Sequence, residues 1–339
     1  SSTILKNSFL ALCLVMKKVV VLGGGTGNFT VLRGLKNYNL DLSAVVSMAD
    51  DGGSTGILRD ELGVLPPGDV RQCLVALSGS GRLMRGLMNY RFENGCLEGH
   101  SFGNIFLSAL EKVTGSFEKA VDEVGKILSI QGKVIPITTN QVRLKMILNN
   151  GKVLGGEGEI YMSNELEQGF RSIFLEPIPK VNNRAIDEIM NADLVVLGPG
   201  GMYSSLIPIL LVDGVSKALR ETKAEKVFVV NLMNKKGQTT GFTVNDYRKE
   251  IVRFIGKDIF DFLIVNNGTP SKELVDMYAV EGGLVTNDLE SDERIVAADL
   301  LDSTKSDYSK TDVLSKHRAL IRHDSKKLAQ VLMGIINEL

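Results

Sequence analysis

Three segments near the start of the chain combine glycine with residue types that handle phosphate and metal ions. The apolar run VVVL ends in GGGTG at residues 23–27, and the apolar run AVV is followed by the acidic and glycine residues of 50–53. A third segment, PPGDVR at 66–71, opens a predicted helix. Glycine lets backbone N–H groups approach an anion closely, and the N-terminus of a following helix adds partial positive charge. Together these segments predict a nucleotide-phosphate site.

Paired carboxylates follow the second apolar run. Asp50 and Asp51 stand about where a Rossmann protein holds the ribose of its ligand, and carboxylates near a diphosphate can also hold Mg²⁺. Side chains of adjacent residues at a strand end point to opposite faces, so we expect only one of them to reach a given ligand. A solvated turn, with an Asp capping the glycines after it, is the alternative.

The third segment adds one acid and one base. Asp69 is predicted to cap the helix that begins at Val70, and Arg71 lies in its first turn, beside a bound anion or beside Asp69 itself. A local ion pair is the alternative to ligand binding. Asp50, Asp51 and Asp69 are the candidate catalytic residues, and Mg²⁺ is predicted at Asp51 or Asp69.

Two later segments carry groups suited to a nucleotide. His100 and Asn104 flank a predicted helix start in GHSFGN, where the amide could hydrogen-bond a base or sugar and the imidazole could polarise a phosphate. A His that only caps the helix is the alternative. GPGGMYSS at 198–205 predicts a second strand–glycine–helix anion site with hydroxyls in its first turn. Lys235 and Lys236 could close over phosphates, although exposed lysines are usually only solvated.

Several common motifs are absent. Asn28 stands where the third glycine of the dinucleotide fingerprint G-x-G-x-x-G would be, and no Gly-Lys-Ser/Thr follows the first loop. The sequence has no G-x-S-x-G elbow and no spacing typical of a structural zinc site. These absences weaken a dehydrogenase assignment and argue against a Walker-type NTPase and a covalent hydrolase.

The composition narrows the class of protein. The 339 residues are 44% hydrophobic, and the formal net charge of −1 leaves no broad basic surface for nucleic acid or anionic membrane. Three cysteines, Cys13, Cys73 and Cys96, predict no disulfide framework and favour a cytoplasmic location. The apolar run 9–15 is too short to span a bilayer. We expect Met16 to be the natural start and residues 1–15 to be an upstream extension.

Five β-branched runs alternate with amphipathic segments, which is typical of βαβ units. We expect strands at Lys18–Leu22, Ser43–Met48, Asp193–Leu197, Lys226–Asn231 and Asp261–Asn266. Each is followed by a loop rich in Gly, Asn or Asp, and ligands of open α/β sheets bind beyond the carboxyl ends of the strands. The pattern predicts an α/β, Rossmann-like, doubly wound and mainly parallel sheet, forming a single domain over 16–339 with one shared ligand crevice.

Residues 130–180 break this rhythm. The segments 134–137, 142–148 and 153–160, with Asn149-Asn150-Gly151 between the last two, predict a small antiparallel β insertion with a type I′ turn. Helices are expected at 101–113, 117–128, 183–191 and 326–339 from their apolar spacing.

Six ordered motifs give the chain a resemblance to a known family. VVVLGGGTG, ADDGGSTG, LPPGDVRQCLVAL, GHSFGN, LGPGGMYSSLIP and IRHDSKKLA resemble the bacterial gluconeogenesis factors, relatives of 2-phospho-L-lactate transferase. The resemblance covers residues 17–339. It implies a Rossmann-like cytoplasmic protein that binds a nucleotide diphosphate ligand, with UDP-sugars as the favoured class and NAD as another ligand. It also implies a role in cell shape and wall synthesis during growth on gluconeogenic carbon sources.

The same resemblance assigns residues to the ligand. Tyr278 and Arg322 are placed on the sugar side, and Gly201 stands where the family more often has a serine, so one hydroxyl contact is lost. With Arg71 and His100 from the segments above, the predicted ligand-binding residues are Gly24, Gly25, Thr26, Gly27, Asn28, Asp51, Arg71, His100, Asn104, Gly200, Gly201, Tyr203, Ser204, Asn231, Asn266, Gly268, Tyr278 and Arg322.

Three functional hypotheses follow. The first is a non-catalytic or weakly catalytic UDP-sugar-binding regulator that needs no obligatory cofactor. We expect it to form homo-oligomers, to have cell-wall synthesis proteins as partners, and neither to bind nucleic acid nor to insert into membranes. The second is a transferase of the phospholactate type that acts on a nucleotide diphosphate donor with Mg²⁺, whose chemistry would need only positioning and charge stabilisation. The third is an NAD-dependent enzyme.

Overall fold

The order of the parallel strands places a topological switch point at the centre of the sheet. The structure, a computed structural model, describes residues 16–302 and 321–339, so the expectation for residues 1–15 lies outside it. Seven parallel strands form the main sheet in the order β10-β9-β8-β7-β1-β2-β3. Their bounds are Lys17–Gly23 (β1), Leu40–Val46 (β2), Lys133–Pro136 (β3), Leu194–Leu197 (β7), Glu225–Val229 (β8), Phe262–Asn266 (β9) and Ile295–Ala298 (β10).

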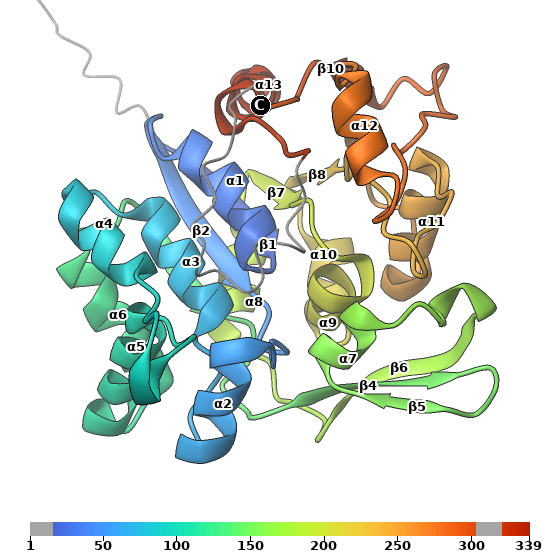
Figure 1. Cartoon of the computed structure of the whole chain (residues 1–339). Coiled ribbons are helices and arrows are strands. Elements are labelled where there is room, and N and C mark those ends of the chain that lie inside the picture. The colour runs from blue at the N-terminus through green and yellow to red at the C-terminus, as the bar shows by residue number, and fades with distance from the viewer. Residues whose placement is uncertain (1–15, 303–320) are drawn as a thin grey trace, which may run out of the picture.

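From the adjacent strands β1 and β7 the chain proceeds outward in opposite directions, which confirms the Rossmann-like, doubly wound prediction. The central strands are apolar throughout because helices cover both faces of the sheet. In β1 the side chains of Val19–Leu22 are at most 2% exposed. α1 packs on α3 and α13, whereas α10 packs on α8 and α11 (Figure 1). The two groups of helices enclose the sheet between them.

The four helices predicted from spacing are confirmed to within about two residues, namely α5 (Phe102–Thr114), α6 (Phe117–Ile127), α8 (Asn183–Met190) and α13 (Ser325–Glu338). The remaining helices are α1 (Gly25–Leu35), α2 (Gly53–Leu62), α3 (Gly68–Leu77), α4 (Arg82–Asn89), α7 (Glu157–Met162), α9 (Ile207–Leu210), α10 (Val215–Glu221), α11 (Val244–Ile255) and α12 (Lys272–Tyr278), with a π-helical turn η3 (Met202–Leu206) before α9.

The helices begin in two different ways. α6, α8, α11 and α13 begin with side-chain caps, and Thr243 and Asp246 form a reciprocal capping box at α11. α1 and α2 instead have glycines at the N-cap, Gly24 and Gly52, which carry no side chain to cap them. Because the first N–H groups of a helix have no partner within the helix, these two starts present donors at the edge where a ligand would bind.

A three-stranded antiparallel sheet forms the predicted insertion, with two corrections. Its order is β5-β4-β6, from Arg143–Leu148 (β4), Val153–Gly155 (β5) and Phe170–Glu176 (β6). The expected strand at 153–160 ends early, because Gly156 adopts a φ of 151° and the chain then forms α7. The segment 134–137, expected in the insertion, instead supplies edge strand β3 of the main sheet by pairing with β2.

The turn between β4 and β5 also differs from the prediction. A type I′ turn needs positive φ at both central residues. Around this turn only Gly151, with a φ of 89°, is positive, and Asn150 is not. Instead, the Gly151 N–H donates to the Leu148 carbonyl, and the Asn150 side chain accepts from the Lys152 N–H. Local side-chain bonding therefore stabilises a different turn.

Within residues 16–302 and 321–339, no single helix is long and apolar enough to cross a bilayer. One pair, Met202–Leu210 and Val215–Glu221, meets the criteria of length and composition only when joined across a 75° bend.

Candidate functional site

The two glycine loops that follow β1 and β7 meet backbone to backbone at the switch point. A Cβ built on Gly27 would lie 1.6 Å from the carbonyl oxygen of Pro199, so no side chain fits there. Gly24 is restricted less severely and by side chains, because its Cβ would lie 2.8 Å from Ser205 Oγ and 2.9 Å from Asp69 Oδ2. The predicted glycines 24–27 and 200–201 are thus brought together around one point.

Two asparagines hold these loops in place. Asn231, after β8, accepts a hydrogen bond from the Gly200 N–H at 3.0 Å and donates to the Gly200 carbonyl at 2.8 Å. Asn28 is fully buried and donates to the carbonyls of Gly23 and Val45, at 3.2 and 3.5 Å. Both were predicted to touch ligand. In this structure their amides hydrogen-bond to backbone groups of the loops and strands. The third predicted polar side chain of this region, Thr26, donates from its Oγ1 to the side-chain oxygen of Gln72.

Asp69 lies directly against the N-terminus of α1. Its carboxylate accepts a hydrogen bond from the Gly25 N–H. Burial and the nearby charge of Asp50 raise the pKa of Asp69 from 3.8 to about 7, in spite of that hydrogen bond and of Arg71. The predicted N-cap role is wrong, because α3 begins at Gly68 after Pro67 and Asp69 lies inside its first turn without a capping bond. Asp69 thus faces α1 rather than its own helix.

Asp50 is the second acid at this point. It accepts hydrogen bonds from the Gly52 N–H, at 3.0 Å, and from the Thr55 side chain. Burial raises the pKa of Asp50, and the charge of Asp51 adds to this effect while Arg59 opposes it. Asp50 and Asp69 therefore form a pair of half-buried carboxyls whose charges disfavour each other.

Asp51 has a different hydrogen-bond partner from Asp50, although β2 ends at Val46 and neither carboxylate lies at the strand end, where both were expected. Asp51 Oδ1 accepts a hydrogen bond from the Gly158 N–H, at 2.7 Å, in the first turn of α7. This contact brings Glu157 to the acidic pair. Burial, followed by the charges of Asp50 and Asp69, raises the pKa of Glu157 well above its usual range, against a hydrogen bond with Ser204. The insertion therefore adds a fourth carboxyl to the carboxyl edge.

A buried polar network lies beside these acids. Arg71 is 7% exposed and donates to Asn104 Oδ1 at 2.8 Å and to Asn89 Oδ1 at 2.7 Å. Asn104 in turn lies 3.4 Å from Ser54 Oγ, which contacts His100 Nδ1 at 3.1 Å. The structure brings together the predicted residues Arg71, His100 and Asn104, and their bonds join the starts of α2, α3 and α5.

The remaining predicted residues lie further along the carboxyl edge. Asn266 exchanges two hydrogen bonds with Gly268 and accepts a third from the Leu300 N–H, so it fixes the loop after β9. Tyr278 packs against the small apolar cluster of Leu232, Met233 and Ile321, and burial raises the pKa of its hydroxyl to about 12, an effect that the charge of Arg322 opposes.

Tyr203 points away from the other predicted residues. It is 4% exposed, packs edge-on against Phe170 and hydrogen-bonds with Glu250 of α11. Burial and the charge of Glu250 raise the pKa of its hydroxyl. The structure thus places Tyr203 in the core between η3, β6 and α11, whereas the neighbouring Ser204 turns toward Glu157.

Comparison with known proteins identifies the family. The profile described as 2-phospho-L-lactate transferase CofD matches residues 19–308. The "Putative gluconeogenesis factor" of Thermoanaerobacterium thermosulfurigenes is 42% identical over 322 residues, 94% of this chain and 97% of that protein. The gluconeogenesis factor of Bacillus subtilis is 35% identical over 328 residues, 95% of this chain and 98% of that protein. The chain belongs to the gluconeogenesis factor family.

A solved structure has the same fold as this chain. The crystal structure of a UPF0052 family member from Bacillus halodurans has a TM-score of 0.83 and 34% identity, and the match covers 94% of this chain and 99% of that one. The family is related to CofD phospholactate transferase.

Sequence reasoning missed three residues of this site. Glu157 was missed because its segment was expected to be a strand, although the glycine pair at 155–156 before two acids is a possible helix start. Ser205, next to Gly24, carried only the general hydroxyl signal of its loop. Arg59 is 5% exposed, acts on Asp50, and has a buried Nη1 without a hydrogen-bond partner among the described residues.

Proposed function

We propose that this gluconeogenesis factor binds a nucleotide-sugar of the UDP-sugar class at the switch point between β1 and β7. We also propose that it acts in the cytoplasm as a binding regulator that links carbon supply to envelope synthesis and cell shape. The observation that carries the binding proposal is the close approach of Gly27 to Pro199 beside the glycine N-cap of α1. The regulatory role follows the resemblance of the sequence motifs.

The diphosphate is the part of the ligand that the geometry supports best. Asp69 occupies the Gly25 N–H, and Asn231 occupies the Gly200 N–H. Among the described residues, the donors that remain for a ligand are therefore the N–H groups of Thr26 and Gly27 in the first turn of α1 and of Gly201 after β7. A contact between a helix N-terminus and a partly buried phosphate contributes on the order of 1 kcal/mol. Donors from two loops would therefore hold a diphosphate without any lysine, which agrees with the absence of a Walker lysine.

A divalent cation fits between this diphosphate and the acids. Asp69 already occupies the Gly25 N–H, so a phosphate that approaches α1 meets a carboxylate unless a cation separates the two charges. Among the described residues no group of three His, Cys, Asp or Glu side chains is arranged to hold a metal alone. Mg²⁺ is commonly bound by one or two carboxylates together with substrate phosphates and water. Asp69 and Asp50 would supply the carboxylates, and Mg²⁺ would neutralise the diphosphate charge.

A phospholactate-type transferase is the second candidate. It is favoured by the mutually repelling pair Asp50 and Asp69, whose raised pKa values are typical of functional sites, and by the match to the CofD profile. In such a reaction these acids would position the cation and the donor diphosphate. No nucleophilic side chain is required for that role.

Calorimetric titration of the full chain with UDP-N-acetylglucosamine, UDP, GDP and NAD, each with and without Mg²⁺, tests these proposals. We expect UDP-N-acetylglucosamine to bind most tightly, at one site per chain, and to be recovered unchanged. Tighter binding of GDP with Mg²⁺ would favour the transferase, and tighter binding of NAD would favour a dinucleotide site. Absence of saturable heat with every ligand would contradict all three.

A further inference from the structure

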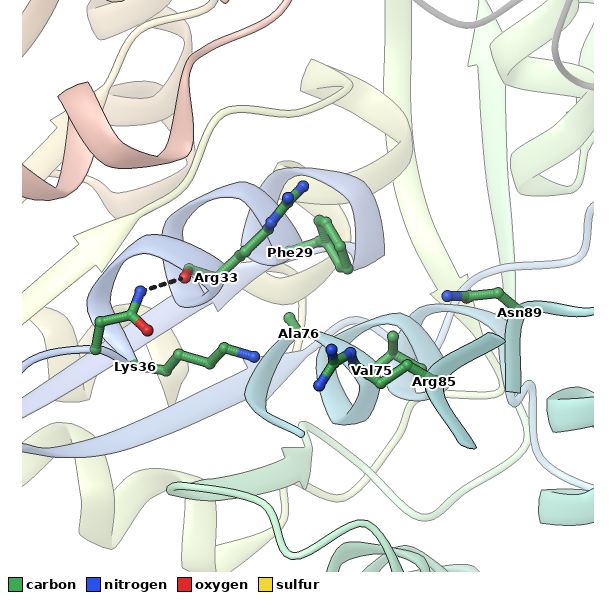
Figure 2. A pocket seen from close by; sticks show the side chains of 8 residues that line it. Phe29, Arg33, Lys36, Val75, Ala76, Arg85 and Asn89 are labelled. Carbon is green, nitrogen blue, oxygen red and sulfur yellow. Dashed lines mark hydrogen bonds between the residues drawn. The ribbon is translucent and has the colours of Figure 1, made fainter. Parts of the chain in front are cut away.

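A second concave surface lies along the seam of α1, α3 and α4, apart from the glycine loops. It is an open pocket of about 410 Å³, within the range typical of small-molecule sites (Figure 2). We call it the seam pocket. Its lining residues are Phe29, Arg33, Lys36, Asn37, Val75, Ala76, Arg85 and Asn89.

The lining of the seam pocket contains three cations and no acid. A neighbouring hollow of about 550 Å³ shares Lys36 and Asn37 with it and also has no acidic residue in its lining. The chain as a whole has 40 acidic and 39 basic residues, so the excess of basic over acidic side chains is particular to this surface. Within residues 16–302 and 321–339, Arg33, Lys36 and Arg85 form no ion pair.

Hydrogen bonds explain where two of these cations lie but leave their charge uncompensated. Lys36 Nζ donates to the Ser78 carbonyl at 2.9 Å, and Arg85 donates to the Ser80 carbonyl. Both carbonyls lie just beyond the C-terminus of α3, and Figure 2 shows the two cationic groups pointing toward one another over Ala76. Burial and the charges of Arg85 and Arg33 lower the pKa of Lys36.

The third cation has no such capping role. The Arg33 guanidinium lies 5.9 Å from the centre of the Phe29 ring, and its side chain makes no hydrogen bond among the described residues. Phe29, Val75 and Ala76 give the seam pocket an apolar wall beside the charges. A ligand that matches this lining has an anionic group and an organic body.

We propose that the seam pocket binds a small organic molecule bearing a phosphate group, in addition to any ligand at the glycine loops. Two guanidinium groups and an ammonium group match the charge and the acceptor geometry of a phosphate, which takes paired N–H donors from arginine. The Asn37 amide nitrogen already donates to the carbonyls of Arg33 and Gly34, and Asn89 Oδ1 accepts from Arg71, so the Asn89 amide nitrogen is the neutral side-chain donor that the lining offers. A bound dianion would relieve the mutual repulsion of the three cations.

Titration of the full chain with inorganic phosphate and pyrophosphate, in low salt and without Mg²⁺, tests the seam pocket. Arg33→Gln removes a guanidinium group that makes no hydrogen bond or ion pair among the described residues. The variant is therefore expected to fold normally and to bind the anions at least about threefold more weakly. Arg33→Gln with Lys36→Gln is expected to weaken binding at least about tenfold, about 1.4 kcal/mol. Lys112→Gln with Lys119→Gln, at two exposed positions, is the control of equal charge change and should stay within about twofold.

Equal weakening in the control would show a general charge effect and overturn the proposal, as would unchanged binding in both pocket variants or absence of saturation at about 1 mM anion. Repeating the titration with excess UDP-N-acetylglucosamine and Mg²⁺ separates the two sites. Phosphate binding that persists under this condition and is weakened in Arg33→Gln belongs to the seam pocket. Complete competition by the nucleotide-sugar would assign it to the glycine loops and contradict the proposal.

Discussion

Gly27, in the first turn of α1, lies against Pro199 of the loop after β7, with space for hydrogen alone between the α-carbon and the Pro199 carbonyl oxygen. These residues are separated by more than half of the chain and belong to the two halves of the doubly wound sheet. Their contact fixes the distance between the two glycine loops, so it determines whether backbone donors from both can reach one diphosphate.

The first prediction concerns this contact. A Cβ in Gly27→Ala would lie 1.6 Å from the Pro199 oxygen, so the two loops must separate. We expect the free energy of unfolding to fall by about 2–4 kcal/mol and nucleotide-sugar affinity to fall at least about tenfold. Gly86→Ala is the matched control, because Gly86 is inside α4 with nothing within 4 Å of the new Cβ. It should be neutral or stabilising by up to about 1 kcal/mol, measured by urea unfolding. Wild-type affinity in Gly27→Ala would refute the role of the loop.

Asp69→Asn should make the protein more stable at high pH, while it removes a proposed Mg²⁺ ligand. The pKa of Asp69 is about 7 in the folded state against 3.8 ordinarily, so the folded state binds the proton more tightly and loses stability as pH rises from about 4 to about 7. Asparagine removes this loss and still offers an oxygen to the Gly25 N–H. At pH 8 we expect a gain of about 1–2 kcal/mol, since each pKa unit corresponds to about 1.4 kcal/mol and solvent at the half-buried carboxyl screens part of it. Without nucleotide and metal, this gain should vanish near pH 3.5.

The same variant tests the metal proposal. In the presence of UDP-N-acetylglucosamine, Mg²⁺ should raise the Tm of the wild type and leave that of Asp69→Asn unchanged. Asp187→Asn, on the exposed surface of α8, is the control and should respond as the wild type does. An equal Mg²⁺ response in Asp69→Asn would exclude Asp69 as a ligand.

His323 should produce the opposite pH dependence. Burial lowers its pKa from 6.5 to about 4, and its Nε2 has no hydrogen-bond partner among the described residues. The unfolded chain therefore binds the proton first, and stability falls as pH drops from about 6.5 to about 4, by about 3 kcal/mol in total. In His323→Gln this part of the pH dependence should disappear, as seen by comparing unfolding of the two proteins at pH 7 and pH 4.5. Parallel losses in both would show that His323 is not responsible.

Arg71 should act mainly on stability. Arg71→Met leaves the side-chain oxygens of Asn104 and Asn89 without their donor, so we expect unfolding to become easier by about 2–4 kcal/mol. Arg82→Met, exposed at the start of α4, should change it by less than about 0.5 kcal/mol. Calorimetric titration of the variant with the nucleotide-sugar then distinguishes a structural role of Arg71 from direct contact with the ligand. A loss of nucleotide-sugar affinity without a loss of stability would make Arg71 a ligand-binding residue.

Local patterns were sufficient to predict the elements that build the carboxyl edge. The five β-branched runs, each ending in small or polar residues, placed the central strands and their loops, because a strand buried on both faces must be apolar at nearly every position. The glycine loops were found from a similar requirement. Backbone that must approach an anion closely cannot carry side chains, and the structure adds that Gly27 also lies against the backbone of Pro199, a contact that the sequence did not predict.

The directions of the side chains could not be predicted from the sequence. They now show which of the predicted ligand-binding residues contact other parts of the fold instead. Asn28 and Asn231 turn toward backbone, and Tyr203 turns into the core. These directions depend on residues distant in the sequence, such as Phe170 of the insertion. The same limit hid Glu157, which reaches the acidic pair only because Asp51 holds the start of α7. A strand assignment for that segment ignored the conformation that Gly156 imposes.

The most direct test of the central claim is amide hydrogen exchange of the full chain with and without UDP-N-acetylglucosamine and Mg²⁺. The account predicts that the ligand slows exchange at least about tenfold in residues 24–28 and 199–205 together, and leaves α4 unchanged. Protection confined to other segments, with both glycine loops unaffected at saturating ligand, would contradict it.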